Sequence, residues 1–204
     1  MPIEARLTGY PRIGPHRELK RALERAWSGR LQGEELDEEV AALREAHLEV
    51  QRGLVGSAVD DFFLYDEVLE TAMMLGLVPD ELASAHRGDP FGLLTALARG
   101  TPQREAWEMT KWFDTNYHFV VPIVDRLPSE LQPLPWREPT DTADTAWAIL
   151  GPYSLVKLSK LTAGTDASAL ASAVGRSSGR GHAIAPPRLR PSACSSTSQR
   201  SGWR

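Results

Sequence analysis

Strand-like segments alternate with amphipathic segments along this chain, and each strand-like segment ends in polar or turn-forming residues. The strand-like segments are 5–10, 58–66, 109–118 and 145–150, and the clusters at their ends read YPRIGPHR, YD, NYH and GPYS. Repeated strand–helix units are typical of α/β folds with parallel strands. In α/β barrels the working residues lie at the carboxyl ends of the strands. The sequence therefore predicts a partial (β/α)8 TIM-type barrel, roughly its first four βα units.

Apolar spacing predicts the helices between these strands. Leu19, Leu23 and Trp27 recur every four residues after Pro15, which predicts a helix that ends near Gly29. A second helix is expected over residues 34–51 and a third over 67–75. Residues 80–108 are expected to be mostly helical, with a break at 98–102, and another helix is expected to begin around Leu155.

Charge divides the chain into two parts. Residues 1–161 hold 17 basic and 26 acidic residues, a net charge of −9, whereas residues 162–204 carry +5. We expect an incomplete barrel domain over residues 1–174 and a disordered basic tail over 175–204, because the tail is too poor in apolar residues to form a core. Its Arg, Ser, Pro, Ala and Gly are typical of a GC-rich gene read out of frame. Nucleic-acid binding is disfavoured because the tail has one aromatic residue, Trp203, and no periodicity.

Several functional classes find no support in the sequence. No apolar run approaches 18 residues, which disfavours a membrane span, and the first residues do not read as a secretory signal. One cysteine, Cys194, excludes an intramolecular disulfide and a thiolate metal cluster within the chain, and no H-x-x-x-H or C-x-x-C motif occurs. We therefore expect a cytoplasmic protein with no metal site, no bound cofactor and no membrane or nucleic-acid partner.

The stretch GPHRELK, residues 14–20, is the first candidate binding site. A helix that begins near Pro15 would direct the free N–H groups of residues 16–18 outward. Arg17 and Lys20 would lie beside them, and this combination suits a carboxylate or a phosphate. The alternative is a solvated basic helix start whose charge is offset by Glu18.

The stretch MTKWFDTNYHFVVP, residues 109–122, is the second candidate. On a strand, Asp114, Asn116 and His118 would share one face with Trp112, and Lys111 would lie on the other face. The face with carboxylate, amide and imidazole suits the lining of a cleft. The alternative is a buried network that only ties the strand to its neighbours.

Four motifs together resemble one known family. GYPRIGPHRELKRALERAWSG, DDFFLYDEVLETAMMLG, MTKWFDTNYHFVVP and LGPYSLVKLSK are similar, in order and spacing, to the amino-terminal part of cobalamin-independent methionine synthase, and the resemblance covers residues 3–161. The family transfers a methyl group from 5-methyltetrahydropteroyl-polyglutamate to homocysteine. Its fold is a pair of (β/α)8 barrels, of which the second holds zinc and the homocysteine site.

The resemblance implies a binding site for the folate polyglutamate tail at Arg17, Glu18, Leu19, Lys20 and Lys111, with Asp114, Asn116 and His118 as candidate lining of the same cleft. It implies no catalytic or zinc-binding residue in this chain, so we expect a truncated amino-terminal domain without activity of its own. Two alternatives are a stand-alone folate- or anion-binding module and a half-barrel completed by a separately encoded chain. We also expect self-association through unpaired barrel edges.

Overall fold

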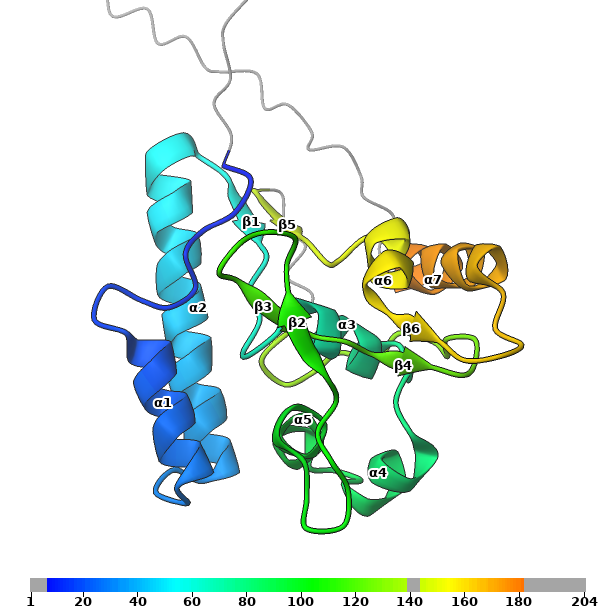
Figure 1. Cartoon of the computed structure of the whole chain (residues 1–204). Helices are drawn as coiled ribbons and strands as arrows, with labels where there is room; N and C mark the ends of the chain where they lie inside the picture. Colours follow the sequence, from blue (N-terminus) through cyan, green and yellow to red (C-terminus); the bar gives the residue numbers. More distant parts are fainter. Residues whose placement is uncertain (1–6, 139–143, 182–204) are drawn as a thin grey trace, which may run out of the picture.

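The computed structural model describes residues 7–138 and 144–181, which form a mixed α/β fold (Figure 1). The helices in this part of the chain are α1 (Glu18–Trp27), α2 (Gly33–Val55), α3 (Glu67–Met74), α4 (Asp80–Ala85), α5 (Pro90–Arg99), α6 (Pro152–Leu158) and α7 (Ala167–Gly181). The strands are β1 (Ala58–Asp60), β2 (Met109–Lys111), β3 (His118–Val120), β4 (Ile123–Val124), β5 (Thr145–Trp147) and β6 (Lys160–Leu161).

The described strands form three separate two-stranded sheets rather than one parallel sheet. β1 pairs with β5 and β4 pairs with β6, both in parallel, whereas β2 and β3 pair antiparallel. The predicted mixed α/β class is confirmed, but within residues 7–138 and 144–181 the sheets are open and do not close into a barrel. The predicted single strand over 109–118 is wrong, because the chain reverses there to form a hairpin. Residues 7–10 form no strand, and the rest of that predicted segment lies outside the described residues.

The predicted helices over 34–51 and 67–75 are confirmed as α2 and α3. The first turn of α2 is fixed by a capping box between Gln32 and Glu35. Residues 80–108 are less helical than expected: they hold α4 and α5, and α5 ends at Gly100, whose φ of 79° suits glycine. The first helix begins at Glu18, three residues after Pro15.

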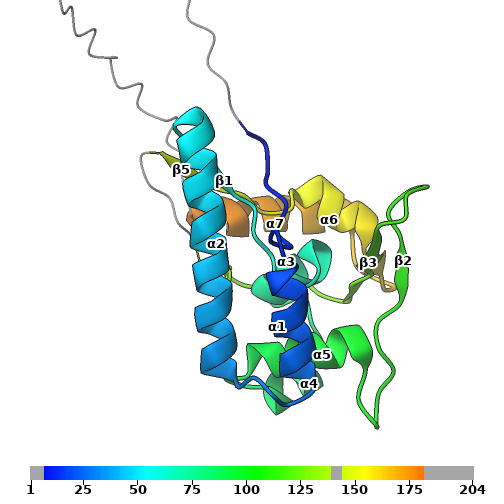
Figure 2. The same ribbon diagram turned by 90° about the vertical axis from the view of Figure 1, so that its left-hand side faces the viewer.

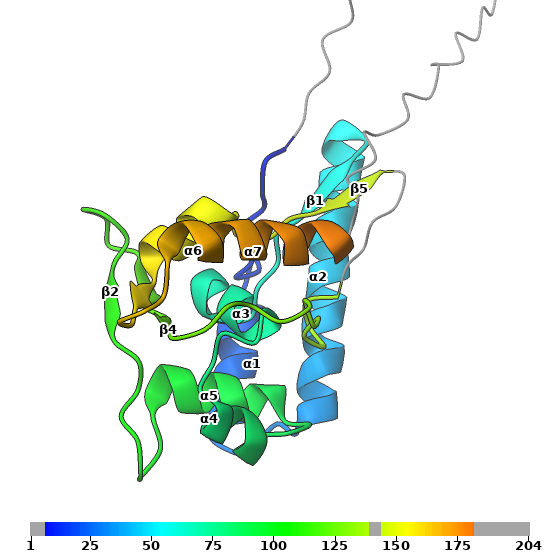
Figure 3. The same cartoon turned by 90° about the vertical axis from the view of Figure 1, so that its right-hand side faces the viewer.

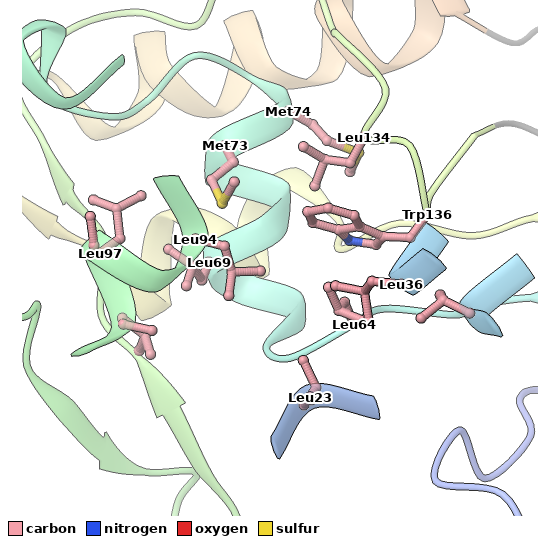
Figure 4. Close-up of a cluster of buried hydrophobic side chains, with 14 of the residues drawn as sticks. Leu23, Leu36, Leu64, Leu69, Met73, Met74, Leu94, Leu97, Leu134 and Trp136 are labelled. Carbon is pink, nitrogen blue, oxygen red and sulfur yellow. The ribbon is translucent and has the colours of Figure 1, made fainter. Parts of the chain in front are cut away.

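Helix α3 lies at the centre of the molecule, and its residues from Val68 to Met74 are all buried. Because it is apolar on most sides, it packs in two directions. On one side Leu69 and Met73 contribute to the cluster around Leu94 and Trp136 (Figure 4). On the other side Val68, Ala72 and Leu75 join a second cluster with residues of β3, α6 and α7.

Helix α7 crosses residue 175, the predicted start of the disordered tail. Leu170 and Val174 are fully buried in the second cluster, and the helix continues to Gly181 beside α6 (Figure 3). Residues 175–181 are therefore helical, in contrast to the expectation. The remainder of the predicted tail, 182–204, lies outside the described residues.

Candidate functional site

The chain turns into α3 through a tight corner, residues 64–66, that is fixed by one carboxylate. Glu70 is fully buried and accepts hydrogen bonds from the backbone N–H groups of Leu64 (3.1 Å), Tyr65 (2.7 Å) and Asp66 (3.2 Å). It also accepts one from the indole Nε1 of Trp136, at 2.9 Å. A buried charge is tolerated when hydrogen bonds surround it, and here four donors do so.

Arg12 holds the opposite side of the same corner. Its Nη1 and Nη2 donate to the carbonyl oxygens of Leu64 and Tyr65, both at 3.0 Å, and its guanidinium lies 4.0 Å from the centre of the Phe63 ring. Burial lowers the pKa of the guanidinium, and nearby acidic groups oppose that shift. Burial raises the pKa of Tyr117, on the β2–β3 hairpin, and the charge of Arg12 opposes that shift.

Asp66 links this corner to the hairpin by a second route. Its carboxylate caps α3 by accepting the N–H of Leu69 at 2.7 Å, and it accepts the N–H of Val120 in β3 at 3.2 Å. Only 3% of Asp66 is exposed. Burial, together with the nearby charge of Glu70, raises the pKa of Asp66 to about 6, against the opposing effect of the two N–H donors.

The β2–β3 hairpin carries the second candidate stretch and lies at the edge of the molecule (Figure 2). Its turn is held by a hydrogen bond from the N–H of Trp112 to the carbonyl of Tyr117 (2.7 Å) and by one from the hydroxyl of Thr115 to the carbonyl of Trp112 (2.6 Å). Phe113 has a left-handed backbone, with φ of 51°. Three predicted cleft residues, Asp114, Asn116 and His118, are exposed on this hairpin.

The expected interior strand face at 109–118 is therefore wrong. Alternation predicts a shared face only while the chain stays extended, and here it turns between Trp112 and Tyr117. The imidazole Nδ1 of His118 lies 3.1 Å from the carbonyl oxygen of Asn116, a contact within the hairpin. Lys111, at the end of β2, is exposed.

The first candidate stretch, at the start of α1, also differs from its expectation. The N–H of His16 donates to the Glu18 carboxylate at 3.0 Å, and the N–H of Arg17 donates to the carbonyl of Gly14 at 3.2 Å. These two N–H groups are therefore not free to bind a ligand. Leu19 is fully buried in the core, so its side chain is closed to a ligand.

The cations of this stretch remain at the surface. Arg17 is exposed and has a left-handed backbone, with φ of 62°. Lys20 is exposed and forms an ion pair with Glu24, also exposed, at 3.6 Å. Within the described residues, Arg17 and Phe113 are the two non-glycine residues with positive φ, one in each candidate stretch. Such backbone strain gathers at functional sites.

Several residues of the buried network around the 64–66 corner were not singled out as site residues by the sequence. Arg12 precedes the first candidate stretch and donates to the carbonyls of Leu64 and Tyr65 in this corner. The polar cluster YD at the end of the second strand-like segment was the available signal for Asp66. Glu70 carried no signal, because a single glutamate in a helix is usually a surface residue.

Two classes of site have no support in residues 7–138 and 144–181. No three His, Cys, Asp or Glu side chains gather there so that they could hold a metal ion. None of the described helices is both long enough and apolar enough to cross a membrane.

The chain matches the family model "Cobalamin-independent synthase, N-terminal domain" over residues 4–175. Three similar relatives carry the name 5-methyltetrahydropteroyltriglutamate–homocysteine methyltransferase. The Streptomyces griseus protein is 39% identical over 171 residues, 80% of this chain and 22% of the relative. The Halalkalibacterium halodurans protein is 41% identical over 162 residues, which are 74% of this chain and 21% of the relative. The Acidithiobacillus ferrooxidans protein is 48% identical over 118 residues, which are 56% of this chain and 15% of the relative.

The chain thus spans about a fifth of the length of the two relatives that it matches over most of its own length. The family match covers both candidate stretches, α3 and the hairpin. This chain belongs to the family of the amino-terminal domain of cobalamin-independent methionine synthases.

Proposed function

We propose that this chain binds the polyglutamate tail of 5-methyltetrahydropteroyl-polyglutamate through Arg17, Lys20 and Lys111. The proposal depends on one observation: backbone strain and exposed positive charge occur in the same two stretches of the chain. The two non-glycine residues with positive φ in the described chain, Arg17 and Phe113, lie in the two candidate stretches, and both stretches present exposed cations. The names of the relatives include a triglutamate of the same ligand.

The chemistry of the tail fits side chains of this kind. A polyglutamate tail is a row of carboxylates, which a guanidinium binds in a fork and an ammonium binds as a point charge. The N–H groups of His16 and Arg17 already have acceptors within the chain. The tail would therefore be held by side-chain charge, with each exposed contact contributing about 0–1 kcal/mol.

The partial barrel belongs to the same proposal. Parallel β1 leads into α3 and parallel β5 into α6, the strand-then-helix order of βα units. The methyl transfer from folate to homocysteine is a proposal for the protein to which such a domain contributes. The resemblance places the family's zinc in the second barrel and not among the residues of this chain. We assign no zinc-dependent step to this chain, and a cytoplasmic location goes with the proposal.

A second candidate follows from the open sheets. Each described sheet has two strands, and unpaired strand edges are sites of pairing with another chain. A half-barrel completed by a separate chain, or by a second copy, would cover those edges. This alternative is compatible with tail binding, because the cations lie on α1 and on the hairpin rather than on β1 or β5.

Calorimetric titration with the monoglutamate and the triglutamate of 5-methyltetrahydrofolate tests the proposal. In Lys111→Ala and in Lys20→Ala, the affinity advantage of the triglutamate should fall by up to about fivefold, with monoglutamate affinity unchanged. Lys157→Ala is the matched control, an exposed lysine on α6. If both variants keep the full triglutamate advantage, the assigned site is wrong.

A further inference from the structure

We infer that His47 anchors the N-terminal segment, residues 7–14, in a pH-dependent way: the neutral ring holds Tyr10 against α2, and protonation of the ring releases the segment. This segment leads directly into the start of α1 (Figure 1). None of the cations assigned to tail binding takes part in the anchor, so the two proposals stand independently of each other.

The ring of His47 lies in a tightly packed position on α2. Only 7% of the residue is exposed. The centre of its ring is 5.1 Å from that of Tyr10 in the segment and 6.3 Å from that of Phe62, which follows β1. Its Nε2 atom is buried and has no hydrogen-bond partner among the described residues. Protonation gives both ring nitrogens an N–H group and adds a charge, so a buried Nε2 without an acceptor favours the neutral ring.

The space beside the ring is too small to hydrate a charged imidazole. A cavity of about 10 Å³ is lined by Tyr10, His47 and Gln51, among other residues, and it holds at most about one water molecule. The side-chain amide of Gln51 is already bonded at both ends, to the N–H and to the carbonyl of Val59. Burial lowers the pKa of His47, against the opposing effect of the Glu18 charge.

Charged groups of both signs surround the ring. Arg44 on α2 and Asp60 on β1 line the same cavity and form an ion pair with each other. Arg12 of the segment also lines it and donates to two backbone carbonyls. Asp61, after β1, and Glu18, on α1, are the remaining acidic groups that would stabilise an imidazolium. Burial raises the pKa of Asp61 as well, so this carboxyl resists charging in the same environment.

The N-terminal segment depends on side-chain contacts to stay in place. Within the described part of the chain, residues 7–12 form no backbone–backbone hydrogen bond. Contacts of the Tyr10 ring with His47 and of the Arg12 guanidinium with the 64–66 corner attach this part of the segment. Expulsion of a protonated His47 ring would remove the first of these two contacts.

Release of the segment has a consequence for the first turn of α1. The carbonyls of Ile13 and Gly14 accept the N–H groups of Leu19 and Arg17, both at 3.2 Å. The anchor therefore keeps these two N–H groups bonded. Because the pKa of His47 in the folded chain lies below its usual value of 6.5, the anchor is complete above that pH and weakens as the pH falls below it.

Hydrogen exchange of the Arg17 and Leu19 amides in the full 204-residue chain tests the anchor. Between about pH 7.5 and about pH 5, the protection factors of these amides should fall several-fold in the unsubstituted chain. His47→Phe keeps a ring against Tyr10 and cannot take up a proton, so its protection factors should differ little between the two pH values. His16→Gln, at an exposed histidine beside the same segment, is the matched control and should behave like the unsubstituted chain. Titration of Asp66 cannot mimic the effect, because its raised pKa stabilises the fold at low pH.

Equal protection at the two pH values in the unsubstituted chain would overturn the anchor, and so would an undiminished loss of protection in His47→Phe. A measurement on the unsubstituted chain decides the matter if His47→Phe does not fold. In an NMR titration, the His47 ring should titrate below pH 6.5, and the ring resonances of Tyr10 should change with the same midpoint. A His47 pKa at or above 6.5, or Tyr10 resonances that do not follow it, would contradict the inference.

Discussion

Burial and hydrogen bonding have opposite effects on the pKa of Asp66. It is 3% exposed, caps α3 and accepts the N–H of Val120, yet burial raises its pKa to about 6. Arg12 and Glu70 both face it, with opposite effects on that pKa. Burial raises the pKa values of the Asp61 and Glu67 carboxyls as well, so this region binds protons more tightly when folded.

The sign of the pH dependence follows from this shift. The folded chain holds the Asp66 proton up to about pH 6, whereas the unfolded chain releases it near 3.8. The contribution of Asp66 to the free energy of unfolding is therefore fully present at low pH and is lost as the pH rises from about 4 to about 6. The total loss is about 3 kcal/mol. Urea unfolding at pH 4 and at pH 7 should show a smaller difference between the two pH values in Asp66→Asn than in the unsubstituted chain. Equal differences in the two proteins would contradict the shifted pKa.

At the scale of elements, the sequence predicts helices better than strands. Leu36, Val40 and Leu43 recur at helical spacing, and α2 forms where that pattern lies, extending to residues 33–55. The stretch 109–118 was ambiguous because aromatic and β-branched residues favour an extended chain in a hairpin as much as in an interior strand. Its turn depends on Phe113 in a left-handed conformation, which the identity of a phenylalanine does not predict.

The candidate site was predictable only in part for a related reason. The exposed cations Arg17, Lys20 and Lys111 follow from the motifs, and the structure leaves all three at the surface. The 64–66 corner joins Arg12, Glu70 and Trp136, which lie far apart in the sequence. Hydrogen bonds over such separations depend on tertiary packing, which local patterns do not contain.

The corner itself yields a prediction about α3 and its neighbours. In the unsubstituted chain, each carboxylate oxygen of Glu70 accepts hydrogen bonds from two N–H groups. Glu70→Gln replaces one of these oxygens with an NH2 group, which cannot accept a hydrogen bond from either N–H. The free energy of unfolding should fall by about 3 kcal/mol, as measured by urea denaturation. Glu24→Gln, at an exposed position on α1, should change it by less than about 0.5 kcal/mol. A Glu70→Gln chain as stable as the control would show that the corner is not held by this carboxylate.

At the scale of the whole molecule, α3 joins two core clusters, and the cations of the candidate site lie at the surface, on α1 and on the hairpin. The whole chain carries a net charge of −4, and its residues 1–161 carry −9, so the net charge repels a polyanionic tail. Attraction must therefore come from the local cations at this surface, within about 10 Å at 0.1 M salt. The tail-binding account depends on that local attraction exceeding the overall repulsion.

The most direct test is the affinity of the unsubstituted chain for the monoglutamate and the triglutamate of 5-methyltetrahydrofolate at low and high salt. We expect tighter binding of the triglutamate at low salt, by roughly threefold to tenfold for two or three exposed cation–carboxylate contacts, and most of that advantage should be lost at about 1 M salt. Equal affinities for the two ligands at low salt, or an advantage that salt leaves unchanged, would contradict a tail site built from Arg17, Lys20 and Lys111.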